Sequence, residues 1–227
     1  MDEEGLPDCT RGYREISYFP SENRLQSKLV EGVRVFYTKR VYIPSHDSQI
    51  LLDTVKTVIA VYSNKVRTVL ELGSGSGYVS AQLVLLGAVL YSIMVDIDAD
   101  AVYSSWATAK ENSIDQRVDV VQCDGASCIR SNAVDLVYFN PPYLPVCDDM
   151  PGAIAWNGGG DGLEVWTKFF EESLRVCREI CAIVFVLSSL QNVRKMLEHL
   201  SRCRSVELLN CEAFFYEMLC GVFTQCR

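Results

Sequence analysis

The chain has 227 residues, of which 49% are hydrophobic and 22% charged, and its formal net charge is −8. This length fits one domain of moderate size, or one domain with an extension, and the apolar content suffices for a substantial core. The negative charge argues against generic binding to the phosphate backbone of a nucleic acid, although it leaves room for a local basic patch.

Residues 1–40 are interpreted as an N-terminal extension, followed by a domain over residues 41–227. In the extension, Gly, Pro, Ser and Asn alternate with aromatic and charged residues. We therefore expect an irregular segment that packs loosely on the domain. Two alternatives stay open: Leu29 to Tyr37 could form a short hairpin or strand, and the segment could act as a lid or substrate-contacting arm.

A helix is predicted just after Pro44, which itself prevents regular helix. Ser45 to Ser48 offer side-chain oxygens for the helix N-terminus. The apolar residues then recur at helical spacing, at Ile50, Leu51, Val55, Val58, Ile59 and Tyr62. Asp47 and Ser48 are expected either to cap this helix or to face a cofactor.

From residue 66 onward, predicted strands and helices alternate. The strands cover 66–72, 89–95, 118–122, 134–139 and 180–187, and the helices cover 78–86, 99–111, 163–178 and 192–200. Two closing strands are predicted at 205–209 and 214–223. This alternation is typical of an α/β fold with a doubly wound, mostly parallel sheet.

A glycine-rich loop follows the first predicted strand, with the sequence Glu71-Leu72-Gly73-Ser74-Gly75-Ser76-Gly77. Gly73, Gly75 and Gly77 allow positive φ and a close approach of the backbone to a ligand. The pattern alone also serves dinucleotides and plain turns. Glu71 would repel a pyrophosphate but attract an ammonium group, which favours S-adenosyl-L-methionine over NAD.

Acidic residues also follow the next two predicted strands. Asp96 comes about 20 residues after the glycine loop, where a carboxylate can accept both hydroxyls of a ribose. Asp124 could accept an adenine amino group, with Gly125 against the ring. The structural alternatives are a helix cap for Asp96 and a turn residue for Asp124.

The segment Phe139-Asn140-Pro141-Pro142-Tyr143 is the most specific signal in the chain. Its two prolines remove two backbone donors and stiffen the loop. The side-chain carbonyl of Asn140 and the backbone carbonyl of Pro141 can then accept both hydrogens of a planar NH₂ group, with Tyr143 packed on its face. This arrangement would orient and polarise a poor nitrogen nucleophile for methyl transfer.

A second loop, Ala155-Trp156-Asn157-Gly158-Gly159-Gly160-Asp161-Gly162, is predicted to be flexible. It is either a surface connection or one wall of the substrate cleft, with Trp156 as a substrate contact. The nearby Asp148 and Asp149 would form an acidic rim that suits a basic peptide better than a nucleic acid.

Ten cysteines are many for this length, yet no C-x-x-C pair occurs. Only His46 and His199 could join the cysteines as zinc ligands, so we expect no metal site. The acidic start of the chain is unlike a secretory signal, and no stretch has the apolar length of a membrane span. We expect reduced, mostly buried thiols and a cytoplasmic location, with the nucleus as an alternative.

Together these motifs resemble the HemK-type glutamine methyltransferases, in particular the eukaryotic branch that modifies class I translation release factors. The resemblance runs from about Val41 to the C-terminus. It rests on five stretches: Tyr42-x-Pro44-x-x-Asp47-Ser48, the glycine loop, Asp96-Ile97-Asp98, Asn140 to Tyr143, and Ala155-Trp156-x-Gly158-Gly159-x-x-Gly162-x-Glu164-Val165.

The resemblance implies a Rossmann-like, seven-stranded class I methyltransferase sheet with an antiparallel last strand and helices on both faces. It implies N5-methylation of the glutamine in a Gly-Gly-Gln motif. The donor site would comprise Ser48, Glu71, Gly73, Gly75, Gly77, Asp96, Asp124, Gly125 and Asn140, and the substrate would meet Asn140, Pro141, Pro142, Tyr143 and Trp156. It also implies a heterodimer with a small zinc-binding activator subunit along the edge of the third strand, at Val118, Val120 and Val121.

Two features depart from this family. His46 stands where the family usually has an acidic residue, and the N-terminal extension is longer than usual. The alternatives are an adenine-N6 methyltransferase of nucleic acid, a protein-lysine methyltransferase and a non-catalytic scaffold. The first requires a basic face near Tyr143, which Asp148 and Asp149 argue against. The scaffold is disfavoured by the intact glycines, Asp96 and Asn140.

Overall fold

The computed structural model describes residues 20–21, 24–62, 66–150, 152–214 and 217–226. The strands in this part of the chain are β1 (Gln26–Val30), β2 (Val33–Tyr37), β3 (Thr68–Leu72), β4 (Tyr91–Asp96), β5 (Val118–Gln122), β6 (Val134–Phe139), β7 (Cys177–Ser188), β8 (Ser205–Phe214) and β9 (Glu217–Gln225). The helices are α1 (His46–Val61), α2 (Tyr78–Leu85), α3 (Ala99–Glu111), α4 (Glu164–Val176) and α5 (Val193–Leu200), with short 3-10 turns at Asp115–Arg117 and Ala153–Ala155. Among these helices none is both long and apolar enough to cross a membrane.

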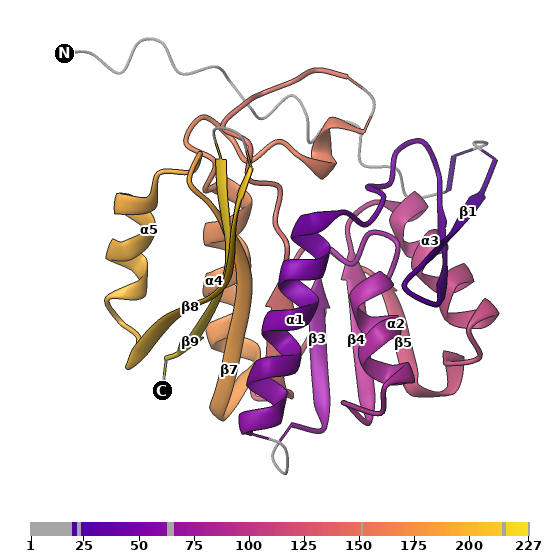
Figure 1. Cartoon of the computed structure of the whole chain (residues 1–227), viewed down its shortest axis with the longest axis horizontal. Helices are drawn as coiled ribbons and strands as arrows, with labels where there is room; N and C mark the ends of the chain where they lie inside the picture. The colour runs from indigo at the N-terminus through magenta and orange to yellow at the C-terminus, as the bar shows by residue number, and fades with distance from the viewer. Residues whose placement is uncertain (1–19, 22–23, 63–65, 151, 215–216, 227) are drawn as a thin grey trace.

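Within the described residues, seven strands form one sheet in the order β5-β4-β3-β6-β7-β9-β8 (Figure 1). The strands from β5 to β7 are parallel, whereas β9 is antiparallel to both of its neighbours. The predicted sheet, mostly parallel with an antiparallel last strand, is therefore confirmed. Several boundaries differ by a few residues, and the largest difference is in β8, which continues to Phe214, where the sequence predicted the start of the last strand.

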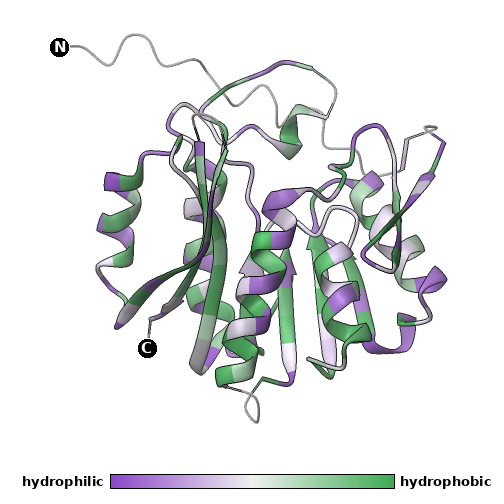
Figure 2. Cartoon of the chain, in the orientation of Figure 1, coloured by the Kyte–Doolittle hydropathy of each residue, from purple (hydrophilic) through white to green (hydrophobic). Residues whose placement is uncertain are grey.

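Two hydrophobic layers hold the sheet between its helices. Along β6, Leu136 and Tyr138 face the core that α1 and α2 cover, whereas Val137 and Phe139 face the core that α4 and α5 cover. Figure 2 shows the central strands as largely hydrophobic and the outer helix surfaces as more polar. Because both faces are buried, the strands read as continuous apolar runs, which is why the sequence pattern located them.

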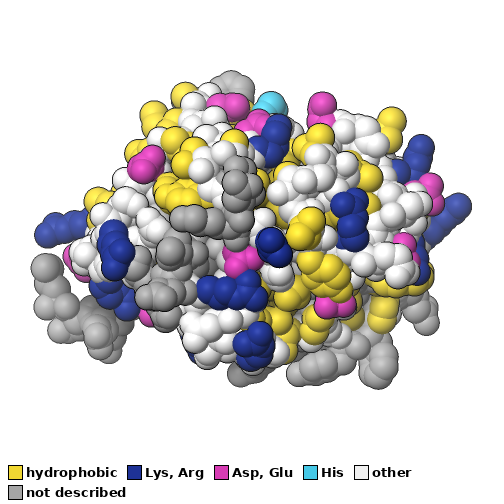
Figure 3. Space-filling model, turned by 90° about the horizontal axis from the view of Figure 1, so that it is seen from below, with side chains coloured by type: hydrophobic (Ala, Val, Ile, Leu, Met, Phe, Trp, Pro, Cys, Tyr) yellow, Lys and Arg dark blue, Asp and Glu magenta, His cyan; other side chains and the backbone are white. Residues whose placement is uncertain are grey.

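The parallel strands end at one edge of the sheet, the upper edge in Figure 1. The glycine loop after β3 and the Asn140 to Tyr143 segment after β6 both lie at this edge. Figure 3 views the opposite end, where lysines and arginines are scattered among hydrophobic side chains. The exposed apolar residues at the far ends of α1 and α2 are Val61, Leu85, Leu86 and Leu90.

Part of the N-terminal extension is regular. β1 and β2 form the antiparallel hairpin that was one of the sequence alternatives, so the expectation of an irregular segment is wrong for this part. The hairpin is fixed to α3, since the backbone N–H of Phe36 donates to Thr108 Oγ1 at 2.9 Å. Residues 1–19 lie outside the described residues, and the domain boundary at residue 40 stays a prediction.

Disulfides among the described residues correct the expectation of reduced thiols. The structure joins Cys123 to Cys128, Cys203 to Cys226 and Cys211 to Cys220. The last two pairs both lie at the β8–β9 hairpin, where strand pairing brings cysteines that are 23 and 9 residues apart to Cα distances of 3.8 and 4.1 Å. Sequence spacing could not reveal this proximity, because it depends on the register of the hairpin.

Candidate active site

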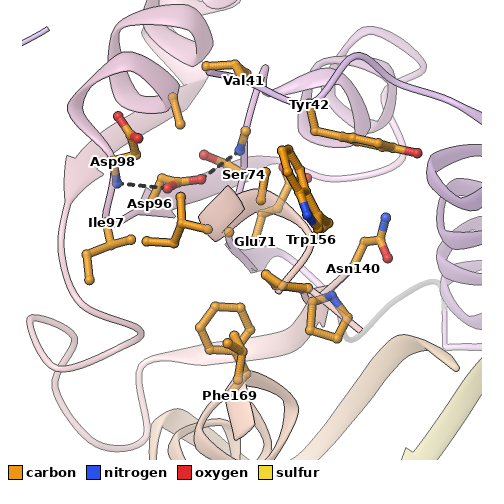
Figure 4. Close-up of a pocket in the computed structure, with 18 of the residues that line it drawn as sticks. Val41, Tyr42, Glu71, Ser74, Asp96, Ile97, Asp98, Asn140, Trp156 and Phe169 are labelled. Atoms are coloured by element: carbon orange, nitrogen blue, oxygen red, sulfur yellow. Dashed lines mark hydrogen bonds between the residues drawn. The ribbon is translucent and has the colours of Figure 1, made fainter. Parts of the chain in front are cut away.

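A cavity of about 410 Å³ opens at the carboxyl edge of the sheet, where parallel α/β sheets bind their ligands. Its walls come from the loops after β3, β4 and β6, the start of α1 and the first turns of α4. Figure 4 shows Asp96 at one side of this cavity and Asn140 at the other. The predicted site residues that line it are Ser48, Glu71, Gly73, Gly75, Asp96, Asp124, Gly125, Asn140, Pro141, Pro142, Tyr143 and Trp156.

The glycine loop wraps the end of β3 in a conformation that favours glycine. Gly73, Gly75 and Gly77 have φ values of 68°, 55° and 73°. Gly77 does not line the cavity, in contrast to the cofactor contact expected for it. It caps α2, and a Cβ atom there would lie 3.1 Å from Ser105 Cα and Met94 Sδ, so its small size lets α2 approach α3 and β4.

Asp96 forms the acidic wall beside this loop. Its two carboxylate oxygens accept from the backbone N–H groups of Gly75 and Asp98 at 2.9 and 3.0 Å (Figure 4). Burial raises the pKa of Asp96 to about 6, and these N–H donors oppose that rise. The backbone contacts fix the carboxylate at the cavity wall, where its remaining lone pairs can accept a diol.

Glu71 lies deeper and is only 4% exposed. Ser80 Oγ donates to its carboxylate at 2.5 Å, and the backbone N–H of Ser80 donates at 3.2 Å. Burial raises the pKa of Glu71 to about 8 despite these hydrogen bonds. A cation bound in the cavity would favour the ionised form of this group.

Asp124 and Gly125 lie at the far end of the cavity, after β5. Asp124 is exposed and forms an ion pair with Lys168 of α4. Gly125 has a φ of 58°, which favours glycine, and a Cβ atom there would displace the Glu172 carboxylate. Cys123, which is paired with Cys128, lines the same end of the cavity.

Asn140 presents an acceptor with no partner. Its Nδ2 donates to Asp47 Oδ2 at 2.9 Å, while its Oδ1 is buried and has no hydrogen-bond partner among the described residues. A buried polar atom without a partner is costly, so such an atom in a cavity points to a ligand donor. The acceptor atom that the Asn-Pro-Pro-Tyr pattern predicted is therefore unpaired in the described part of the chain.

The Trp156 loop is held against the Asn140 segment by backbone hydrogen bonds, so it is better tied down than the flexible loop expected from its glycines. Leu144 donates to the Trp156 carbonyl at 3.1 Å, and Gly158 donates to the Leu144 carbonyl at 2.8 Å. The indole N–H of Trp156 donates to Asp148 Oδ2 at 2.7 Å. Part of the expected acidic rim therefore positions Trp156.

Several cavity residues escaped the sequence reasoning. Phe169 of α4 packs beside Gly73 and resembles an ordinary helix core residue in the sequence. Asp47 was weighed as a cap or a cofactor-facing residue but was not included in the predicted site, and Glu217 begins a strand that no motif links to the site. Their proximity depends on tertiary packing, for which a single sequence carries no signal. The other such lining residues include Arg40, Val41, Ile97, Val165 and Lys168.

Comparisons with known proteins agree with this geometry. Residues 28–210 match the family described as methyltransferase small domain. The chain is 31% identical over 167 residues to the eRF1 methyltransferase catalytic subunit mtq2 of Schizosaccharomyces pombe, covering 65% of this chain and 72% of the relative. It is 26% identical over 193 residues to a release factor glutamine methyltransferase of Aquifex aeolicus, covering 80% and 67%.

Solved structures share the fold at low sequence identity. The hMettl16 catalytic domain, solved with the MAT2A 3'UTR hairpin 1, has a TM-score of 0.65 at 15% identity and covers 86% of this chain and 75% of that one. Methanocaldococcus jannaschii Trm5, solved with adenosine, has a TM-score of 0.58 at 15% identity and covers 91% and 58%. At such identities the likeness establishes the fold.

Proposed function

The chain belongs to the methyltransferase small domain family, and from this premise we propose that it methylates a class I translation release factor. The donor is S-adenosylmethionine, and the acceptor is the side-chain amide nitrogen of the glutamine in a Gly-Gly-Gln motif. The named relatives support this choice, since both act on release factors by their names. The branch predicted from the sequence motifs agrees with them.

The observation that carries the proposal is the unpartnered, buried Asn140 Oδ1 in the same cavity as Asp96. An amide substrate has the NH₂ group that this acceptor requires, and in the proposed complex the Pro141 carbonyl would accept the second hydrogen. The amide nitrogen is a poor nucleophile because its lone pair is delocalised. Accepting both hydrogens orients it and increases its electron density, and Tyr143 supports the plane of the group.

The cavity residues also fit the donor chemically. S-adenosylmethionine, when bound, supplies an electrophilic methyl group on a sulfonium. Asp96 would hold the ribose hydroxyls and Glu71 would face the cationic amino-acid end, with Ser48, Gly73 and Gly75 around it. Asp124 and Gly125 would hold the adenine, provided that Lys168 releases Asp124 or turns aside. These roles are the proposal's assignments for the lining residues.

The direct test uses labelled S-adenosylmethionine with the purified chain, alone and with an activator subunit. Three acceptors are compared: a class I release factor, the same factor with its Gly-Gly-Gln glutamine changed to alanine, and duplex DNA. We expect label only on the first. Label on the alanine variant would mean that another residue, such as a lysine, is the methylated one. Label on DNA would support the adenine-N6 alternative.

We further propose that the small zinc-binding activator adds to the sheet along β5. This strand pairs only with β4 among the described strands, so its other edge is open. Val118 is buried and Val120 and Val121 are half-buried, which gives the strand the apolar character that a partner would cover. Open apolar edges are sites of pairing with another chain.

A further inference from the structure

We propose that Asp47 is a positioning residue that sets the orientation of the Asn140 carboxamide for amide methylation. The inference rests on the proposed function for its catalytic consequence, but the orientation itself is a property of this chain. Asp47 lies in the first turn of α1, whereas Asn140 follows β6, so the contact joins two elements 93 residues apart. Both residues line the cavity.

The Asp47 carboxylate is buried and surrounded by donors. It is 4% exposed, and its Oδ2 accepts from Asn140 Nδ2 at 2.9 Å. Its Oδ1 accepts from the Ser48 backbone N–H at 2.7 Å and from the Tyr42 hydroxyl at 3.2 Å. The hydrogen bonds described for this carboxylate therefore all come from donors, so both of its oxygens act as acceptors.

This donor pattern decides which way the Asn140 amide faces. Both Asp47 oxygens act as acceptors, so the neighbouring amide must turn its NH₂ group toward Asp47. The opposite orientation would bring two oxygens to a hydrogen-bond distance without a hydrogen between them. Asn140 Oδ1 is thereby turned away from Asp47, and it has no partner among the described residues.

The orientation matters for the reaction because the substrate amide also donates through NH₂. If the Asn140 carboxamide were reversed, two NH₂ groups would face each other and the acceptor would be lost. In addition, a hydrogen bond from the Asn140 NH₂ to a carboxylate polarises the amide and makes Oδ1 a better acceptor. Asp47 thus acts through Asn140 and needs no contact with the substrate.

The competing explanation is that Asp47 merely stabilises the start of α1. The two roles predict opposite orders for two substitutions. Asparagine keeps the volume of Asp47 and can still accept a hydrogen bond from Ser48 N–H. A capping role therefore predicts a smaller loss of kcat in Asp47→Asn than in Asp47→Ala. For the positioning role, the amide introduced by Asp47→Asn can donate its own NH₂ to Asn140 Oδ1 and hold the carboxamide reversed. The positioning role therefore predicts that Asp47→Asn lowers kcat at least as much as Asp47→Ala does.

The experiment measures kcat, KM and donor binding for both variants with a release factor as acceptor. We expect kcat to fall about 10- to 100-fold in Asp47→Asn, the scale of a small misplacement of a catalytic group. The Kd for S-adenosylhomocysteine should change by less than about threefold. Asp53→Asn is the matched control, because it removes a carboxylate from an exposed part of the same helix, and its kcat should match the wild type.

An Asp47→Asn variant with kcat near that of the wild type, or with clearly higher kcat than Asp47→Ala, would overturn the inference. A second readout tests the orientation without any acceptor. In ¹⁵N-asparagine-labelled wild type, the Asn140 Nδ2 protons should exchange slowly and shift downfield, and they are assigned by their loss in Asn140→Ser. Rapid exchange of the Asn140 Nδ2 protons would contradict the proposed orientation. If these protons are protected but the wild type does not methylate the release factor, only the proposed acceptor substrate is wrong.

Discussion

Two carboxylates, the buried Glu71 and the half-buried Asp96, give the site its pH behaviour. Each has a pKa above its ordinary value because burial penalises the ionised form. Glu71 belongs to a buried group of hydroxyls, since Ser80 Oγ lies 2.7 Å from both Ser92 Oγ and Tyr138 Oη. This group offers hydrogen bonds but no positive charge among its described members, which is why the pKa of Glu71 stays high.

The pH dependence of stability should change when Glu71 is replaced by glutamine. Between pH 4.5 and about 8 the folded wild type holds a proton on Glu71 that the unfolded chain releases. The free energy of unfolding therefore falls as the pH rises through this range, by about 1.4 kcal/mol per unit of pKa difference. In Glu71→Gln the decline should be smaller, as measured by urea unfolding at pH 5 to 8. Parallel curves for the two proteins would contradict the raised pKa.

A second prediction at this scale concerns Asn140→Ala. Because we assign Asn140 Oδ1 to the substrate, this variant should lose turnover by at least about 100-fold, the scale of removing an oriented acceptor for the reacting group. Donor affinity, measured by calorimetry with S-adenosylhomocysteine, should stay nearly intact. A collapse of donor binding would mean that Asn140 belongs to the donor site instead.

At the residue scale, the sequence predicted the groups whose chemistry is tied to a motif. Glu71, Asp96 and Asn140 follow buried strands, and parallel strands must end at a common edge. Phe169 was missed as a site residue and Asp47 was left open between a cap and a cofactor contact, because helix residues reach the cavity only through packing. The disulfide partners at the β8–β9 hairpin were missed because their proximity depends on the strand register.

At the scale of elements, α1 connects the sheet to the site. Its N-terminus supplies Asp47 and Ser48, and its middle packs on β9, where Gly221 lies directly beneath Thr54. Thr54 is completely buried, and its hydroxyl donates to the Ile50 carbonyl at 2.7 Å. Close contact between this helix and β9 therefore requires a residue without a side chain at position 221.

Gly221→Ala should destabilise the fold by about 1–3 kcal/mol, since its methyl group would overlap Thr54 and force α1 outward. Thermal unfolding measures this effect. The double variant Gly221→Ala/Thr54→Ala should recover part of the loss relative to the sum of the two single variants, because it removes the hydroxyl and methyl that obstruct the new atom. Simple additivity would show that the two sites do not touch.

The alternation of apolar strands and helices predicted most elements within a few residues, because each strand is buried on both faces. The β8–β9 hairpin was harder. β8 is an edge strand with mostly exposed side chains, so its sequence lacks the apolar run that located β3 or β6. The β1–β2 hairpin was ambiguous for the same reason, since β1 is also largely exposed.

At the scale of the whole molecule, the sheet has two edges of different character. β5 carries half-buried valines at one edge, whereas β8 at the other carries exposed Val206 and Leu208 among polar residues. The negatively charged chain, with a net charge of −8, is also suited to a basic acceptor surface. The proposed activator and acceptor thus address different regions of the molecule.

Val120→Lys should weaken association with the zinc-binding activator, because a lysine on an edge strand opposes pairing with another chain. The measurement is the amount of activator that co-purifies with the tagged chain. Val206→Lys, on the opposite edge strand and 40% exposed in the wild type, is the control and should leave co-purification unchanged. Equal recovery with both variants would place the activator elsewhere.

The β8–β9 hairpin has a consequence for the order in which the chain acquires its structure. β8 pairs only with β9 among the described strands, and β9 separates it from β7. In a nascent or truncated chain that ends after β8 but before β9, β7 becomes a long apolar edge strand with unpaired backbone groups. Such an edge promotes aggregation. Cys203–Cys226 and Cys211–Cys220 both join the hairpin to itself, so oxidation of these pairs holds β8 against β9 independently of their contact with β7.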